Sequence, residues 1–169
     1  GFRMTDDTTR VTRADASDLD GILALQAGNQ IARGGTLAAS LPPERVVAMM
    51  AAMPLIVARR GARVVGFLLT TDRAMNADLA IVRAMFAAYP GAPDAYVYGP
   101  ICVDADARGQ GLAQRMFDAL RVLEPGREGV LFIRTDNTPS LRAHLKMGMR
   151  EVARFPFNGF EYAVFAYVG

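Results

Sequence analysis

The sequence predicts an α/β fold in which one mixed sheet of seven strands forms the centre of a single domain. Two segments, 55–70 and 151–168, each contain two strand-like runs separated by a short turn sequence, which is typical of a hairpin. Between them, residues 96–135 follow a strand-helix-strand pattern. Antiparallel hairpins on both sides of a strand-helix-strand unit indicate a mixed rather than a fully parallel sheet.

Length and composition set the broad class. The chain has 169 residues, of which 51% are apolar and 21% are charged, as in an ordinary soluble globular domain. The formal net charge of +2 argues against a nucleic-acid partner. The longest apolar run, 46–58, contains a proline and is too short to span a bilayer, so we expect no membrane partner.

The ends of the chain and its cysteine content add two expectations. No signal peptide is visible, and we expect residues 1–9 to be a flexible N-terminus in which Gly1 is a tag remnant. The domain is then residues 10–169. A single cysteine, Cys102, cannot form an internal disulfide, which agrees with a cytoplasmic location.

The first half of the chain divides into short elements. Residues 11–13 form a short strand, and Ser17 is the expected cap of a helix with apolar residues at helical spacing. Residues 29–40 are polar and glycine-containing, which indicates a loop. Pro42-Pro43 opens a second helix, whose methionine-rich apolar face is typical of a core surface.

The remaining elements follow from the same signals. The hairpin strands 55–59 and 64–70 flank the turn Gly61-Ala62, and Asn76 is the expected cap of a third helix. Asn158-Gly159 is the strongest hairpin signal in the sequence. The other predicted elements are strands 96–103, 129–135, 151–157 and 160–168, a helix from Gly111 to about Leu123, and a short helix from Pro139 to Met147, capped by Thr138 and stopped by Gly148.

The segment from Tyr96 to Ala113 is the most informative of these. It predicts a buried strand, a tight turn and a helix start, with Gly109 and Gly111 where the backbone turns. The first free amides of the helix, with Arg108 beside them, form a nest that suits phosphate oxygens. A turn that only reverses the chain is the alternative. The dinucleotide fingerprint is incomplete because Gln114 occupies its third glycine position, and the Gly-Lys-Ser/Thr pattern is absent.

Two motifs together resemble the GCN5-related N-acetyltransferases, the GNAT superfamily. Arg108–Ala113 matches the Q/R-x-x-G-x-G/A loop of that family. The segment Asn137–Met149 is similar to its second landmark, an Asn after a strand and then a short helix ending in Lys-hydrophobic-Gly-hydrophobic. The resemblance covers the chain from about Arg10 to Val168. It implies helices on both faces of the sheet and central strands that splay apart to admit acetyl-CoA as acyl donor.

The resemblance also implies how the donor is held. Proline at position 100 suggests a bulge or an unpaired edge in the central strand, which is either a simple edge strand or a local opening. In the family, free backbone groups here pair with the pantetheine arm, and the loop amides bind the pyrophosphate. Asn137 bonds the arm, assisted by Ser140, although an Asn at a turn can also be only a cap. The implied cofactor-binding residues are Ile101, Cys102, Val103, Arg108, Gly109, Gln110, Gly111, Leu112, Ala113, Asn137 and Ser140.

Catalytic side chains are harder to assign. His144 stands where the family often places a tyrosine that protonates the departing thiolate, and histidine can supply a proton near neutral pH. A histidine that only packs is the alternative. Cys102 is expected to be a packing residue rather than a nucleophile. The candidates for a general base are Glu161, Tyr98 and Tyr162, with Asp104 and Asp106 more typical of loop formers.

The sequence therefore predicts an N-acetyltransferase that moves an acetyl group from acetyl-CoA to a primary amine by direct attack. The acceptor is a small molecule or a peptide, and a homodimer, frequent in the resembled family, is left open. A single histidine and no cysteine cluster indicate no metal site. Two alternatives are a catalytically silent acyl-CoA-binding sensor or scaffold, and a nucleotide-binding α/β domain.

Overall fold

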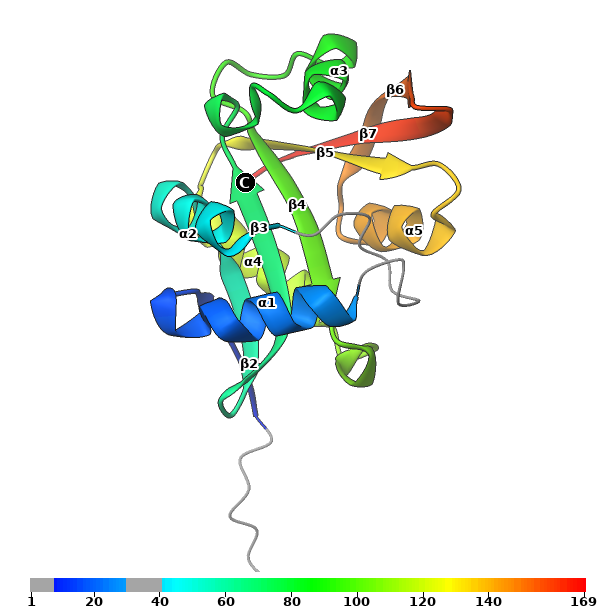
Figure 1. Ribbon diagram of the computed structural model, residues 1–169. Coiled ribbons are helices and arrows are strands. Elements are labelled where there is room, and N and C mark those ends of the chain that lie inside the picture. The colour runs from blue at the N-terminus through cyan, green and yellow to red at the C-terminus, as the bar shows by residue number, and fades with distance from the viewer. Residues whose placement is uncertain (1–7, 30–40) are drawn as a thin grey trace, which may run out of the picture. The chain divides into compact units, whose positions relative to one another are not determined.

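The computed structural model describes residues 8–29 and 41–169 (Figure 1). The predicted loop 29–40, apart from Asn29, and residues 1–7 of the predicted flexible N-terminus lie outside the described residues. The elements are β1 (Thr9–Arg13), α1 (Leu19–Gly28), α2 (Pro43–Ala52), β2 (Ile56–Arg60), β3 (Arg63–Thr71), α3 (Ala80–Ala88), β4 (Tyr96–Val103), α4 (Leu112–Leu123), β5 (Glu128–Arg134), α5 (Thr138–Lys146), β6 (Arg150–Phe157) and β7 (Phe160–Val168). Three 3-10 turns, η1 (Ala16–Asp18), η3 (Ala74–Asn76) and η4 (Ala105–Ala107), connect them.

In the described part of the chain the strands form one seven-stranded sheet with the order β1-β2-β3-β4-β5-β7-β6. The β4–β5 pair is parallel, whereas β1–β2, β2–β3, β5–β7 and β6–β7 are antiparallel. The predicted mixed sheet is confirmed. The chain divides into two compact units. The first holds the described residues up to Thr70 and Pro100–Leu123, and the second holds Thr71–Gly99 and Glu124–Gly169.

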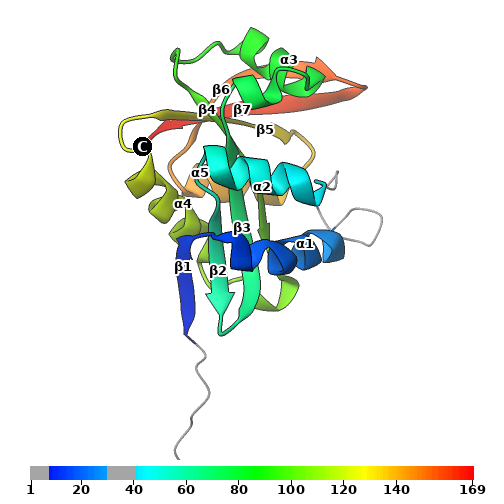
Figure 2. The ribbon, with the colours of Figure 1, turned by 60° about the vertical axis from the view of Figure 1, so that its left-hand side comes forward.

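In the first unit, α1 and α2 cover one face of β1–β3 and α4 covers the other (Figures 1 and 2). The sequence explains α4, since Met116, Phe117 and Leu120 lie at helical spacing and are all buried. The start of α1 differs from the prediction. Asp15, not Ser17, is the cap, and it caps η1, which leads directly into α1: the Asp15 carboxylate accepts from the Ser17 amide and Asp18 completes a reciprocal capping box.

The second unit is built on β5, β7, β6 and the first half of β4. Side chains alternate between the faces of a strand. One face therefore carries Val97, Val130 and Val164, which pack with α3. The opposite face carries the alternate residues Tyr96, Tyr98 and Tyr167, which form edge-to-face aromatic contacts.

Two turns of the second unit can be compared with the sequence predictions, one at the last hairpin and one before α3. At the β6–β7 hairpin, Asn158 and Gly159 have φ angles of 48° and 82°, as the predicted turn requires. The predicted cap at Asn76 is wrong. Asn76 lies in η3, and its buried amide donates to Thr71 and Asp72 instead, while α3 begins at Ala80. The Asn76 side chain is therefore already bonded within this turn and does not cap the first turn of α3.

Candidate functional site

The loop Arg108–Ala113, between η4 and α4, keeps an open space at the N-terminus of α4. Gly109 and Gly111 have φ angles of 78° and 73°, which L side chains rarely adopt, and a Cβ at either would meet no atom within 4 Å. The space is a cavity of about 190 Å³. Backbone amides and the positive end of the α4 dipole face such a site, so it suits an anion. Its lining residues are Val103, Ala107, Arg108, Gly109, Gly111, Leu112 and Ala113.

Arg108 and Gln110 differ in how the loop uses them. The Arg108 guanidinium donates to the Val103 carbonyl and to the Asn29 side chain, both at 3.3 Å, and so stays at the mouth of the cavity. Gln110 accepts a hydrogen bond from Arg60 at 2.7 Å and is not part of the cavity lining. The structure therefore places the Arg108 charge at the cavity and uses the Gln110 side chain to tie the loop to β2.

The second half of β4 has a backbone edge that β3 does not use. The Asp104 amide donates to the Val65 carbonyl of β3 at 2.8 Å. Because backbone groups alternate in direction along a strand, those of Cys102 also turn toward β3, whereas those of Ile101 and Val103 turn toward the opposite edge. All three residues were predicted to bind the donor through their backbone. The backbone groups of Cys102 face β3, and those of Ile101 and Val103 face away from it.

The first half of β4 leaves its parallel partner after two positions. The β4–β5 register contains Tyr96 with Gly129 and Val97 with Val130. Gly99 then has a φ angle of 110° and is followed by Pro100, which has no amide hydrogen. The irregularity expected at Gly99-Pro100 is thus limited to the positive φ of Gly99, since β4 continues from Tyr96 to Val103 without a break.

Cys102 and the two nearby aspartates have structural surroundings. Burial raises the pKa of the Cys102 thiol to about 11, with Asp104 adding to the rise and Arg108 opposing it, so the thiol is neutral near pH 7. Asp104 and Asp106 both accept from Arg63, at 2.6 and 3.1 Å. Asp104 also caps η4. These contacts fit the packing and loop-forming roles expected from the sequence.

In the second unit, Asn137 caps α5. Its side-chain oxygen accepts from the Ser140 amide at 3.3 Å, and the helix begins at Thr138. Thr138 was the expected cap, and that expectation is wrong because the Asn side chain reaches the free amide first. Gly148 ends the segment with a φ angle of 94°, as predicted.

His144 lies on α5 and is only 4% exposed. Its Nδ1 is 2.7 Å from the Ser140 carbonyl oxygen, and its Nε2 is 3.2 Å from the Tyr98 hydroxyl. A carbonyl can only accept, so Nδ1 carries the proton. Burial lowers the pKa of His144 below its ordinary value, more strongly than the Ser140 carbonyl raises it. The ring is therefore neutral near pH 7, with the lone pair on Nε2.

Tyr98 is the partner that sequence reasoning did not connect with His144. Burial, and then the nearby Tyr96, raise the pKa of Tyr98 far above its ordinary value, so its hydroxyl stays protonated and donates to Nε2. The rings of Tyr98 and His144 meet edge to face, with centroids 5.5 Å apart. The available sequence signal was the spacing of Tyr96 and Tyr98, which lie two positions apart on the strand. This spacing places both rings on one face of the sheet.

The other base candidates are engaged elsewhere in the second unit. Glu161 is exposed and forms an ion pair with Arg154 at 3.1 Å. Tyr162 stacks on Phe155, with ring centroids 5.4 Å apart. Each has a structural partner that accounts for its position.

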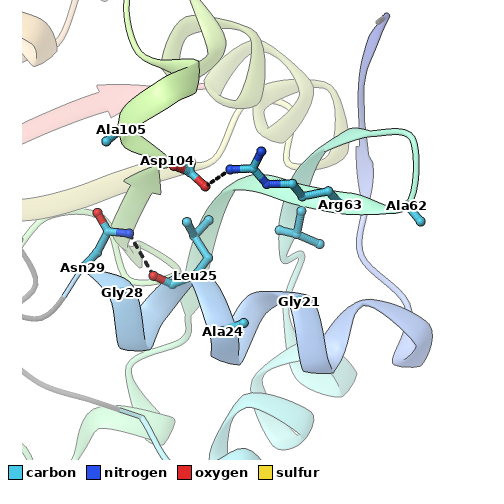
Figure 3. A pocket seen from close by; sticks show the side chains of 10 residues that line it. Gly21, Ala24, Leu25, Gly28, Asn29, Ala62, Arg63, Asp104 and Ala105 are labelled. Atoms are coloured by element: carbon cyan, nitrogen blue, oxygen red, sulfur yellow. Dashed lines mark hydrogen bonds and ion pairs between the residues drawn. The ribbon is translucent and has the colours of Figure 1, made fainter. Parts of the chain in front are cut away.

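A second cavity, of about 340 Å³, lies in the first unit beside α1 (Figure 3). The small residues Gly21, Ala24 and Gly28 line it from the helix, and the Arg63–Asp104 ion pair borders it from the opposite side. The sequence did not predict this cavity, because its walls come from segments far apart in the chain.

Residues 8–29 and 41–169 contain neither a metal-ligand cluster nor a membrane-spanning helix. No group of three or more His, Cys, Asp or Glu side chains there could hold a metal ion. None of the helices in these ranges combines the length and the apolar character needed to cross a membrane.

Solved structures share this fold. An acetyltransferase of the GNAT family from Streptococcus agalactiae superposes with a TM-score of 0.71 at 15% identity, over 95% of each chain. An N-acetyltransferase from Staphylococcus aureus gives 0.69 at 20% identity, over 95% of this chain and 98% of that one. NAA60 from Arabidopsis thaliana, solved in complex with acetyl-CoA, gives 0.71 at 15% identity, over 96% and 100%.

Comparisons based on sequence find one matching protein family. No curated protein matches the chain. A family model described as the acetyltransferase (GNAT) family matches residues 35–149, which include the loop before α4 and the whole of α5. This match spans more than half of the chain, so the protein belongs to the GNAT family of acetyltransferases.

Proposed function

We propose that the protein is an N-acetyltransferase that transfers the acetyl group of acetyl-CoA to a primary amine. The observation that carries the proposal is the open cavity before α4, with two left-handed glycines and Arg108 at its mouth. The family match includes this loop, and NAA60, which has the same fold, was solved with acetyl-CoA. The acceptor is a small molecule or a peptide.

In the proposed binding mode, the loop before α4 binds the pyrophosphate of acetyl-CoA and β4 binds its pantetheine arm. The pyrophosphate accepts hydrogen bonds from the amides at Gly109–Ala113, and Arg108 supplies a charge. The backbone groups of Ile101 and Val103 pair with the amides of the pantetheine arm as a substitute strand. From α5, Asn137 and Ser140 stay predicted contacts of the arm.

The proposed reaction is direct attack of the amine on the thioester carbonyl. Backbone amides of β4 polarise the carbonyl oxygen as charge develops on it. The neutral thiol of Cys102 argues against a covalent acyl-enzyme at this residue. Holding the donor and the amine in line supplies much of the rate, which needs few catalytic side chains.

A thermal-shift comparison with acetyl-CoA, CoA, NAD and ATP tests the donor. A ligand at a hundred times its Kd stabilises by about 2.7 kcal/mol, or about 5–10 °C in Tm for a domain of this size. We expect a shift with the two CoA compounds. A shift with NAD or ATP instead, or with none of the four, would overturn the assignment.

An amine panel then tests the reaction. Release of free CoA thiol is followed with acetyl-CoA and with polyamines, amino acids, aminoglycosides and peptides with free N-termini. Turnover with one class supports the enzyme and identifies the acceptor. Tight acetyl-CoA binding without turnover across the panel would favour an acyl-CoA-binding sensor.

A further inference from the structure

The last two residues of β2, Arg59 and Arg60, bind partners on opposite faces of the sheet. Neighbouring side chains point to opposite faces along a strand. The Arg59 guanidinium donates to Asp18 of η1, whereas the Arg60 guanidinium donates to the Gln110 side chain at 2.7 Å. Arg60 therefore reaches the loop before α4, where the proposed function places the pyrophosphate of the donor.

Arg115 approaches the same end of the β1–β2 pair from the first turn of α4. Its guanidinium donates to the Thr9 carbonyl of β1 at 2.9 Å, and Thr9 lies directly opposite Arg60 in the β1–β2 register. Its backbone amide donates to the Gly111 carbonyl at 3.1 Å. The loop and the first turn of α4 are thus joined to the two strands at adjacent positions.

The hydrogen bond from Arg60 holds the loop at its middle residue. Gln110 lies between Gly109 and Gly111, which both have a positive φ and, without a Cβ, few steric restraints on their backbone angles. A segment of this kind loses conformational entropy when a ligand orders it. A contact that already orders the segment in the free protein reduces this loss and so favours binding.

We propose that Arg60 and Arg115 form a brace that positions the backbone amides of the loop before α4 for the pyrophosphate of the donor. This inference rests on the proposed acetyl transfer. The two arginines are positioning residues, because they act through Gln110 and Gly111 while the loop amides contact the donor. Position 110 is unspecified in the Q/R-x-x-G-x-G/A motif, so the brace is a feature of this chain.

The two arginines are also positive charges beside a proposed anion site, so their charge must be distinguished from their geometry. The exposed Arg10 of β1 provides the matched comparison. It lies directly opposite Arg59 in the register and therefore on the face away from Arg60. Removing its charge changes the net charge of the same strand pair by the same amount and leaves both contacts of the brace in place.

Calorimetric titration with acetyl-CoA is the first test. Arg60→Met and Arg115→Met keep the aliphatic stem but lose the hydrogen-bond donors, and each should weaken the affinity by about three- to tenfold. Arg10→Met should stay within about twofold of the wild type, because salt screens an exposed charge that lies outside the site. An equal weakening in Arg10→Met would mean that the arginines act through net charge, and would overturn the brace.

A double-mutant cycle with Gln110→Ala separates positioning from direct contact with the donor. Without the Gln110 side chain, Arg60 lacks the partner through which it acts, so Arg60→Met should cause no further loss of affinity in that background. Additive losses would overturn the positioning role. A simultaneous loss of preference for CoA over dephospho-CoA would then assign Arg60 to direct contact with the additional phosphate of CoA.

Steady-state kinetics with the amine found in the panel provide a readout that a purely structural role would not move. Arg60→Met should raise the KM for acetyl-CoA and keep kcat within about twofold of the wild type, since the brace acts on binding. Its Tm without ligand should stay within about 2 °C, as for other surface substitutions. A lower kcat with an unchanged KM would contradict the brace.

The outcomes for the brace and for the proposed function differ. Wild-type binding of acetyl-CoA with unchanged affinity in both Arg60→Met and Arg115→Met overturns the brace alone. A wild type that binds neither acetyl-CoA nor CoA overturns the proposed function, and the brace with it.

Discussion

At the residue scale, the burial of an imidazole without a charged partner ties its protonation to folding. His144 has a folded pKa below its ordinary 6.5, because burial disfavours the charged ring. The unfolded chain therefore binds a proton at a pH where the folded chain does not. Stability contributed by the neutral ring is fully present above pH 6.5 and is lost as the pH falls from there toward the folded pKa.

This linkage gives a prediction for the pH dependence of unfolding. Between pH 7.5 and 5, the wild type should lose more free energy of unfolding than His144→Gln, whose amide does not titrate. Urea denaturation at several pH values measures the difference. Equal slopes for the two proteins would mean that His144 is accessible to protons in the folded state.

A second residue-scale prediction concerns Asp18, which is 5% exposed and accepts from Arg59 at 2.6 Å. The Arg59 guanidinium lowers the pKa of Asp18, so the pair contributes stability that is lost as the pH falls below 3.8. Asp18→Asn should reduce stability by about 1.5–3 kcal/mol at pH 7. The exposed pair of Asp118 with Arg121 provides the control, since Asp118→Asn should change stability by less than about 1 kcal/mol. A similar loss in both variants would contradict the assignment.

At the scale of single elements, two substitutions in the loop before α4 distinguish the effect of backbone conformation from the effect of charge. Gly111→Ala introduces a side chain at a φ of 73° and should lower stability by about 1–2 kcal/mol with little effect on acetyl-CoA affinity, because the space around the Cβ is open. Gly111→Asp adds the same strain and a carboxylate in the proposed anion site, and should abolish binding. Calorimetric titration with acetyl-CoA compares them. Equal affinities would remove this loop from the donor site.

At the start of α5, two substitutions of Asn137 likewise distinguish its role as a helix cap from a contact with the donor. Asn137→Ala removes the cap and should lower stability by about 1 kcal/mol. Asn137→Asp keeps a capping oxygen but loses the amide donor, so thermal unfolding should be close to that of the wild type. A weaker acetyl-CoA affinity in Asn137→Asp would support the predicted contact with the arm. An unchanged affinity would leave Asn137 as a cap alone.

At the scale of the whole molecule, the sequence predicted the order and type of the elements well, because the signals were local. Hydrophobic periodicity placed α4, and Asn158-Gly159 placed the last hairpin. The errors came from competition between neighbouring polar groups. At the starts of η1 and α5, Asp15 and Asn137 took the capping role expected of the next hydroxyl residue.

The site was less accessible to prediction than the fold. The glycine turn was visible because its residues are consecutive, and the structure gives it an open cavity. The contact between Tyr98 and His144 joins residues 46 positions apart, and its direction depends on a backbone carbonyl. No pattern in the sequence encodes which imidazole nitrogen faces which partner.

The alternation along the second half of β4 has a consequence for hydrogen–deuterium exchange. The amides of Cys102 and Asp104 turn toward β3 and should exchange slowly, as the bond from Asp104 to Val65 requires. The amides of Ile101 and Val103 turn away and should exchange quickly in the free protein. The strand should therefore show deuterium uptake at every second residue, and a bound arm that pairs with it should remove this alternation.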